Sequence, residues 1–254
     1  MSSTLGCIGL SVDDTESLDA LVGRLLPDAA VVARSGELQA RRWVDASGAS
    51  LTMTVRQSGD DEGVLVDIVP SYVAPTGGGA GHDGVRLGSL SGYGDVLAAD
   101  LVDDAGTRVL RVACDLAQSI VTEVSDPRPA HLTALGLDLT VHADAAAFAA
   151  SDESVISTPG PGQTPLRFAT ESLLAYGLSE DAAKAQPTAF VSGTVLSVSS
   201  QTNAETGQGF HTARLLTSAG HVTACLAAGD HPDPPRLGNV LSGVCYLVLD
   251  VPDL

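Results

Sequence analysis

Two stretches, Leu135-Gly-Leu-Asp-Leu-Thr-Val141 and Leu241-Ser-Gly-Val-Cys-Tyr-Leu247, are short apolar runs that each contain one glycine. Short runs rich in aliphatic and β-branched residues, bounded by turn-forming residues, are typical of β-strands. Both stretches therefore predict strands. Their similarity also raises the question of whether the chain contains duplicated units.

Three glycines mark a repeated hairpin pattern elsewhere in the chain. Gly48, Gly106 and Gly220 each lie between two β-type runs, and each follows an apolar residue by five places and a turn-favouring residue by three. Glycine adopts the backbone conformations that tight turns require. We predict a hairpin at each glycine. Duplication is one explanation of the pattern, and the general use of glycine in hairpin turns is the other.

The remaining elements follow from hydrophobic periodicity and from capping residues. We predict a strand over 5–12, then a helix that begins after Asp13-Asp14 and ends at Pro27. Two short helices are predicted over 171–176 and 179–187, and an Ala-rich helix over 144–150. The other predicted strands are 30–33, 38–44, 51–55, 64–69, 96–102, 109–116, 189–198, 210–216, 222–226 and 240–251.

Two segments with the composition of linkers, 74–84 and 151–165, divide the chain of 254 residues into three. We predict an α/β module with antiparallel strands over 1–75 and a β-rich segment ending in a helix over 85–150. Residues 165–254 are predicted to form short helices followed by a small β-barrel of the OB kind. The predicted fold class is therefore α+β, with strands predominating.

The charge of the chain argues against nucleic acid as a partner. The formal net charge is −18, and the basic residues are 12 arginines and one lysine, Lys184. Binding to phosphate backbones depends on Lys and Arg, which are scarce here. The preference for arginine, with abundant Ala, Gly and Asp, resembles the coding bias of high-GC bacteria.

We expect a cytoplasmic protein. The N-terminus lacks a basic signal region, and no apolar run approaches the ~20 residues that cross a bilayer. The four cysteines, Cys7, Cys114, Cys225 and Cys245, are far apart and form no C-x-x-C pair. In a reducing compartment this spacing favours buried free thiols over disulfides.

Three familiar functional motifs are incomplete or missing in the sequence. The dinucleotide-binding pattern lacks its structural context, the phosphate loop is missing, and the nucleophile elbow fails on spacing. Gly79-x-Gly81-x-x-Gly84 matches the dinucleotide-binding pattern, but it lies in a glycine run after Pro75 rather than between a strand and a helix. The sequence contains no Gly-x-x-x-x-Gly-Lys phosphate loop. Gly88-Ser-Leu-Ser-Gly92 has leucine where a nucleophile elbow requires serine.

Several polar residues are weaker candidates for chemistry. His142 and Asp144 have the spacing of an acid/base pair on one strand face, although Asp144 also suits a helix cap. A separate group, His211, His221, Cys225, His231 and Cys245, could form a metal site only across strands, because four residues of strand separate His221 from Cys225 by about 13 Å. Arg41 and Arg42 flank Trp43, and adjacent strand residues face opposite sides.

These observations predict a non-catalytic protein that interacts with a protein partner or with itself. The alternative is an enzyme or small-ligand-binding protein with a site between segments, using His142, Asp144 or the C-terminal histidines. We assign no catalytic residue and predict no cofactor, no metal, no nucleic acid and no membrane association.

Overall fold

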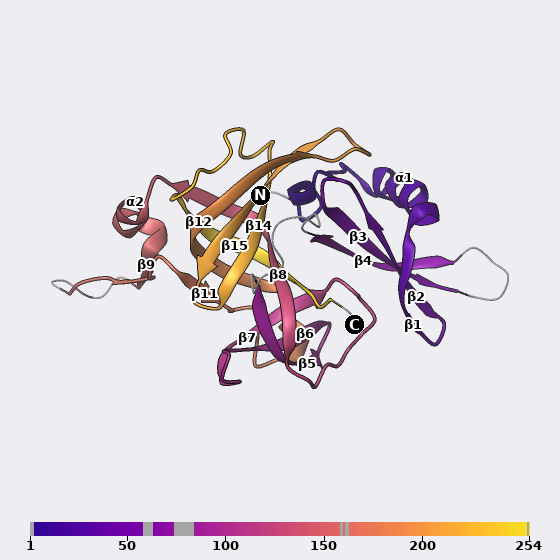
Figure 1. Cartoon of the computed structure of the whole chain (residues 1–254), viewed down its shortest axis with the longest axis horizontal. Coiled ribbons are helices and arrows are strands. Elements are labelled where there is room, and N and C mark those ends of the chain that lie inside the picture. The colour runs from indigo at the N-terminus through magenta and orange to yellow at the C-terminus, as the bar shows by residue number, and fades with distance from the viewer. Residues whose placement is uncertain (1–2, 58–62, 74–83, 158–159, 161–162, 253) are drawn as a thin grey trace.

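The computed structural model describes residues 3–57, 63–73, 84–157, 160, 163–252 and 254. These residues form a four-stranded sheet, a nine-stranded sheet and a two-stranded ribbon, with a few short helices (Figure 1). The β-rich character predicted from the sequence is confirmed. None of the helices in the described ranges has the length and hydropathy that crossing a bilayer requires.

The four-stranded sheet is an antiparallel meander covered on one face by helix α1 (Thr15–Leu25). The Asp14 side chain accepts a hydrogen bond from the Ser17 amide at 2.8 Å, and the predicted cap is confirmed. Leu21 and Leu25 of α1 share a buried cluster with Leu51 of the sheet. The strands are β1 (Ala30–Ser35), β2 (Leu38–Val44), β3 (Ala49–Arg56) and β4 (Val64–Tyr72), and the 3-10 helix η2 (Leu26–Asp28) precedes them.

The strand predicted over residues 5–12 is wrong. Gly6–Ile8 form a 3-10 helix, η1, and Gly9 follows with φ of +70°. A Cβ atom at Gly9 would lie 2.8 Å from the carbonyl oxygen of Gln208, so the segment packs closely against the chain before β13. The neighbouring residues Cys7 and Ile8 are both fully buried. In a half-buried strand, adjacent side chains point to opposite faces, so only one of the two would be buried.

Eight strands of the nine-stranded sheet are arranged like a ring. Its strand order is β11-β12-β13-β14-β8-β15-β7-β6-β5, and further pairings join β12 to β15 and β8 to β5. The pairings therefore close two circuits of five strands that share β8 and β15. The strands are β5 (Val85–Tyr93), β6 (Val96–Val102), β7 (Arg108–Leu116), β8 (Arg128–His142), β11 (Ser172–Leu174), β12 (Thr188–Thr202), β13 (Gly209–Thr217), β14 (Gly220–Ala227) and β15 (Val240–Asp250).

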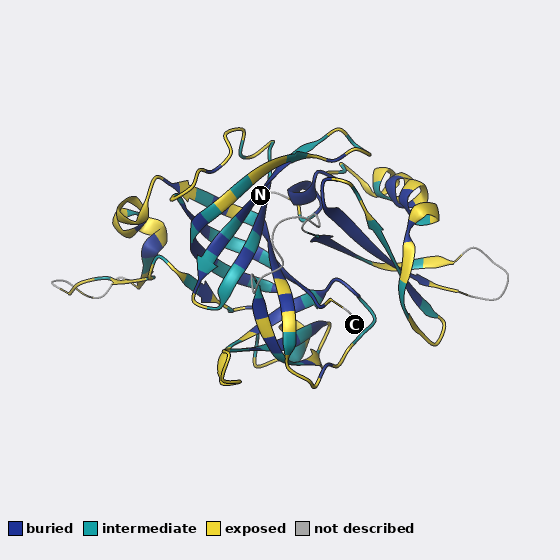
Figure 2. Ribbon diagram, viewed as in Figure 1, coloured by how far each residue is buried: buried dark blue, intermediate teal, exposed yellow. Residues whose placement is uncertain are grey.

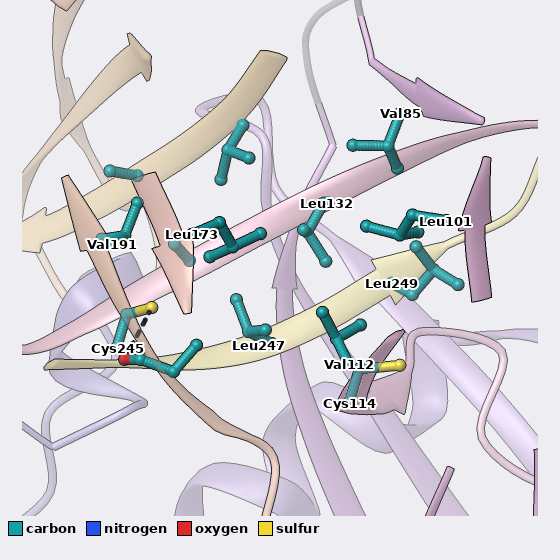
Figure 3. Packing of buried hydrophobic residues seen from close by; sticks show 14 of the residues in the cluster. Val85, Leu101, Val112, Cys114, Leu132, Leu173, Val191, Cys245, Leu247 and Leu249 are labelled. Atoms are coloured by element: carbon teal, nitrogen blue, oxygen red, sulfur yellow. Dashed lines mark hydrogen bonds between the residues drawn. The ribbon is translucent and has the colours of Figure 1, made fainter. Parts of the chain in front are cut away.

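The shared pair β8–β15 contains the two glycine-bearing stretches that predicted strands. They pair antiparallel from Val240↔His142 to Asp250↔His131, with an irregularity between Val244 and Cys245. Gly243 adopts φ of +138° beside it, and a Cβ there would lie 2.0 Å from the Asp138 carbonyl oxygen. Leu132, Leu247 and Leu249 point from this pair into one apolar core (Figure 3).

The three predicted hairpins are confirmed. Gly48, Gly106 and Gly220 have φ of +88°, +80° and +106°, and they join β2 to β3, β6 to β7 and β13 to β14. Glycine is the residue that adopts this region without a steric penalty. Whether these hairpins descend from one duplicated unit stays a prediction.

Of the two short helices predicted near the start of the third segment, the first is wrong and the second is reduced to three residues of 3-10 helix. Ser172–Leu174 form β11, which pairs with β12, and Ala182–Lys184 form the 3-10 helix η4. Leu173 is buried in the main core opposite Val191, so burial against a neighbouring strand determines the conformation. The Ala-rich helix is confirmed as α2 (Ala145–Ala150), and η3 (Asp152–Ser154) and the ribbon β9 (Val155–Ser157) with β10 (Leu166–Arg167) follow it.

Strand β8 links the predicted second and third segments. It belongs to the segment 85–150, yet it pairs with both β14 and β15 of the segment 165–254. A closed circuit of the C-terminal strands therefore includes a strand from the middle of the chain. The proposed domain boundaries and the OB-like barrel stay predictions.

Candidate functional site

The second face of the four-stranded sheet packs on the outer face of the ring. Thr52 of β3 donates a hydrogen bond from Oγ1 to the Ala117 carbonyl oxygen at 2.6 Å. Val69 of β4 and Val248 of β15 share an apolar cluster at the middle of this contact. In Figure 2, strands of both sheets carry buried residues, drawn in dark blue. Polar groups lie at the two ends of this junction.

One end is held by a buried ion pair between β2 and β15. The guanidinium of Arg42 contacts both carboxylate oxygens of Asp250, at 3.3 Å from Nη1 and 2.9 Å from Nη2. Arg42 also donates from Nε to Ser50 Oγ at 2.8 Å and from Nη2 to Ser71 Oγ at 3.4 Å. Each side chain of the ion pair is 12% exposed. The bidentate contact between Arg42 and Asp250 and the added hydrogen bonds offset the desolvation cost of burying both charges.

Gln118 completes the coordination of Asp250. Its Nε2 donates to Asp250 Oδ1 at 2.6 Å and to the Val251 carbonyl oxygen at 2.8 Å. The adjacent Ser119 has φ of +58°, which is uncommon for a residue other than glycine, and its Oγ lies 2.6 Å from Thr54 Oγ1. The turn after β7 is thus hydrogen-bonded both to the four-stranded sheet and to the ring.

A pocket of about 380 Å³ opens beside this ion pair, between the two sheets. Its lining combines polar groups from β2, β4, β8, β14 and β15 and from the chain after β7 with apolar groups that include the chain after β15. The lining residues are Val32, Arg42, Tyr72, Val73, Gln118, His131, Thr133, Thr223, Asp250, Pro252 and Leu254.

The floor of the pocket is the outer face of three neighbouring strands. Thr223 of β14 is the register partner of Thr133 of β8, and Asp250 of β15 is the partner of His131. His131 and Thr133 are two residues apart, so they project from the same face of β8. The side chains of His131, Thr133 and Thr223 have no hydrogen-bond partner among the described residues.

The opposite end of the junction is acidic. The Tyr246 hydroxyl of β15 donates to Asp115 Oδ2 of β7. Burial raises the pKa of Asp115, and the Tyr246 hydrogen bond partly opposes this; the nearby Asp67 carboxylate of β4 raises it further. Burial also raises the pKa of Asp67 and, assisted by Asp115, that of the Tyr246 hydroxyl. No cation pairs with these carboxylates among the described residues.

The structure separates the predicted pair His142 and Asp144. Asp144 Oδ1 accepts from the Ala147 amide at 2.8 Å and caps α2. His142 Nε2 instead lies 2.8 Å from Ser242 Oγ, and the imidazole packs edge-on against Phe148 at a centroid distance of 5.2 Å. Ser242 is fully buried, so a substrate has no access to this histidine–serine pair.

The C-terminal histidines also have structural contacts. His211 lies 3.0 Å from Ser200 Oγ through Nδ1 and 2.9 Å from the His231 carbonyl oxygen through Nε2. The His221 Nδ1 atom lies 3.2 Å from Arg214 Nη2. Burial lowers the pKa of His231. In the described part of the chain, no group of three or more His, Cys, Asp or Glu side chains is placed to hold a metal ion.

The four cysteines are free and buried, as predicted. Burial raises the pKa of Cys7 and of Cys245 to about 12, and it raises the pKa values of Cys114 and Cys225 as well. The thiolate is the nucleophilic form of cysteine. All four side chains are therefore protonated apolar groups at neutral pH.

The arginines beside Trp43 separate onto two faces. Arg42 faces the ring and pairs with Asp250, whereas Arg41 and Trp43 lie opposite Met53 and Leu51 on the side of α1. Sequence reasoning named Arg42 but missed Gln118, His131, Thr133, Thr223 and Asp250, which belong to no motif. One signal was available: Asp250 is a carboxylate within the apolar run 240–251. The glycine motif at 79–84 lies outside the described residues, except for Gly84.

A second pocket, of about 570 Å³, lies between the N-terminal segment and the ends of β13 and β14. Its lining is mainly backbone and small side chains, including Gly6, Gly209 and Gly229. Gln208 is already used there, because its side chain bonds the Ser11 amide at 2.8 Å and the Ser11 carbonyl oxygen at 3.0 Å. The pocket beside Arg42 offers more side-chain chemistry.

Comparisons of the chain with protein-family models, with curated proteins and with solved structures found no match.

Proposed function

We propose that this protein binds a small molecule in the pocket between the four-stranded sheet and the ring. Ligand sites are concave, commonly have volumes of roughly 300–1,000 Å³ and combine apolar walls with a few polar groups. The pocket of about 380 Å³ has this composition, with Val32, Val73 and Leu254 beside the polar floor.

One observation carries the proposal. Three polar side chains, those of His131, Thr133 and Thr223, line the pocket without a hydrogen-bond partner among the described residues. Thr133 is 2% exposed, Thr223 is partly buried and His131 is exposed. Buried polar groups are normally satisfied by protein, water or ligand. A bound molecule with hydrogen-bonding groups would satisfy all three at once.

Binding without catalysis is the proposed activity. Within the described residues, no serine, cysteine or threonine lining this pocket is bonded to a histidine or carboxylate that could act as its base. The charged groups Arg42 and Asp250 are bonded to each other rather than to a reacting centre. A cytoplasmic location is also proposed, supported by four free buried thiols.

A thermal-shift screen against metabolites tests the proposal. A ligand that binds the folded state raises the melting temperature with concentration. We expect at least one compound to stabilise the native protein and to lose this effect in Thr223→Leu, which fills the pocket. Thr107→Leu, in the exposed turn between β6 and β7, is the matched control and should respond like the native protein. Stabilisation that persists in Thr223→Leu would place the binding elsewhere.

We also propose a second candidate function, interaction with a protein partner or with a second copy of the chain. The observation that favours it is the arm formed by β9 and β10, which extends from the ring in Figure 1. Ile156 and Leu166 on this arm are 46% and 60% exposed. Exposed aliphatic groups on a projecting hairpin are suited to protein contacts.

Light scattering after size exclusion tests self-association through the arm. We expect an oligomer that Ile156→Ser with Leu166→Ser converts to a monomer. Leu237→Ser is the control, because Leu237 is 75% exposed in the loop before β15. A native protein that is monomeric at all concentrations would exclude the second-copy version.

The OB-like barrel is retained as a proposal for the architecture of the C-terminal region. It is supported by the circuit of five strands formed by β12, β13, β14, β8 and β15. Small closed sheets of this kind commonly present a ligand-binding outer face. The proposed pocket has its floor on that face.

A further inference from the structure

We propose that the ligand of the pocket between the sheets is an uncharged, polyhydroxylated molecule of about the size of one sugar ring. This inference rests on the proposed function, since it names the class of molecule that the same pocket would take. It follows from three properties of the lining: its charges, its unpaired polar groups and its apolar walls.

The charges of the pocket are already compensated. Arg42 directs two nitrogen atoms at Asp250 and a third at Ser50, and Asp250 also accepts from Gln118. An anion would have to displace Asp250 from Arg42, and a cation would have to displace Arg42 from Asp250. Either exchange leaves one buried charge without its partner, which is costly. The net charge of −18 further disfavours anions at long range.

The unpaired groups of the floor both donate and accept hydrogen bonds. The hydroxyls of Thr133 and Thr223 each supply a donor and acceptor sites, and the His131 imidazole adds two ring nitrogens. The two threonines are register partners on adjacent parallel strands, so their Cβ atoms have the spacing of neighbouring strands, about 5 Å. Adjacent hydroxyl groups on a ring have the same dual character and suit this row of partners.

The walls supply the apolar complement. Val32 of β1, Val73 after β4, and Pro252 and Leu254 after β15 contribute apolar groups to the pocket lining. A sugar ring carries C–H groups on its faces and hydroxyls around its edge, so it can contact apolar walls and a polar floor together. Neutral polyols therefore satisfy all three properties, whereas an apolar ligand would leave the floor unpaired.

Titration with defined probes tests the inference. Native protein is titrated with glucose, galactose and myo-inositol, and with the charged analogues glucuronate and glucosamine, while amide chemical shifts are recorded. We expect saturable binding of at least one neutral probe and at least tenfold weaker binding of its charged counterpart. Thr133→Val with Thr223→Val removes both hydroxyls at nearly constant shape and should weaken binding at least tenfold. Thr107→Val is the matched control.

The possible results separate this inference from the proposed function. Tighter binding of glucuronate or glucosamine than of the neutral sugars would overturn the ligand class. Absence of binding by every sugar, together with a metabolite hit of another class that Thr223→Leu abolishes, would also overturn it and leave the proposed function standing. Absence of any pocket-dependent hit in either experiment would overturn both.

Discussion

The two polar ends of the junction between the sheets treat buried charge in opposite ways. At the Arg42 end, the Arg42 guanidinium and the Asp250 carboxylate form a bidentate ion pair. Gln118 donates a further hydrogen bond to Asp250, and Ser50 accepts one from Arg42. At the Asp115 end, two carboxylates approach each other, and a tyrosine hydroxyl is the principal partner of Asp115. The same two sheets are thus joined by a compensated pair at one end and by an acidic group at the other.

Stability and ionisation are coupled at the acidic end of the junction. In a compensated pair, removing one member leaves the other charge buried without its partner. An uncompensated carboxylate that is partly buried instead takes up a proton more readily, which is seen as the raised pKa of Asp115. The two ends should therefore respond differently to mutation and to acid.

The largest expected effect is at the compensated end. Arg42→Ala should lower the free energy of unfolding by about 3 kcal/mol, because it leaves the Asp250 carboxylate buried without its cation. Urea denaturation measures this. Arg42→Met with Asp250→Asn removes both charges and keeps an acceptor for Gln118, so it should recover most of the loss.

A matched arginine distinguishes burial from charge. Arg108 lies 3.5 Å from Asp100, but its side chain is 59% exposed. Arg108→Ala should change stability by less than about 0.5 kcal/mol, since exposed ion pairs contribute little. Equal losses for Arg42→Ala and Arg108→Ala would contradict the role given to the buried pair.

A smaller effect is expected when the tyrosine at the acidic end is changed. Tyr246→Phe should destabilise the protein by about 1–2 kcal/mol, because the partly buried Asp115 carboxylate loses its hydroxyl donor. The pKa of Asp115 should also rise further, since this hydrogen bond lowers it. Carboxyl carbon chemical shifts followed against pH measure the second effect. A pKa of Asp115 that is unchanged in Tyr246→Phe would disprove the contact.

The smallest expected effect is a gain in stability on neutralising the acidic end. The folded-state pKa of Asp115 lies above its ordinary value near 3.8, so folding favours the protonated carboxyl. Its contribution is fully present below that ordinary value and is lost as the pH rises through the folded-state pKa. Asp115→Asn should therefore be more stable than the native protein at neutral pH, by on the order of 1 kcal/mol.

The pH dependence of that gain is the decisive measurement. The stability difference between Asp115→Asn and native protein should shrink as the pH falls through the folded-state pKa of Asp115 and should reach its minimum below pH 3.8. Asp126→Asn, at a largely exposed carboxylate, is the control and should show no such trend. A difference that is constant with pH would exclude this account of Asp115.

Much of the secondary structure could be predicted because it depends on neighbours in the sequence. The runs 38–44 and 96–102 match β2 and β6 at both ends, and the caps at Asp14 and Asp144 were both identified. Turn glycines and capping carboxylates act on amides within a few residues, so a local pattern is sufficient.

The errors occur where distant contacts override local preference. Residues 5–12 are an apolar run like those of strands, yet Gly6–Ile8 form a 3-10 helix, and Gly9 packs closely against the Gln208 carbonyl oxygen. Strand β5 was not predicted, since its sequence Val85-Arg-Leu-Gly-Ser-Leu-Ser-Gly-Tyr93 is rich in glycine and serine and is stabilised by pairing with β6 and β8. The pocket was missed for the same reason: its threonines, histidine and carboxylate come from strands brought together by sheet closure.

The acidic and β-rich character of the chain, the hairpin turns at Gly48, Gly106 and Gly220, and the buried thiols were all predictable from the amino-acid sequence. These properties depend on composition and on short-range conformational preference. Three other features emerge only when the chain is folded: two circuits of strands share β8 and β15, Arg42 meets Asp250 across 208 positions of sequence, and a pocket opens beside this pair. Such pairings depend on which faces the packed sheets bury against each other, and no local pattern encodes that choice.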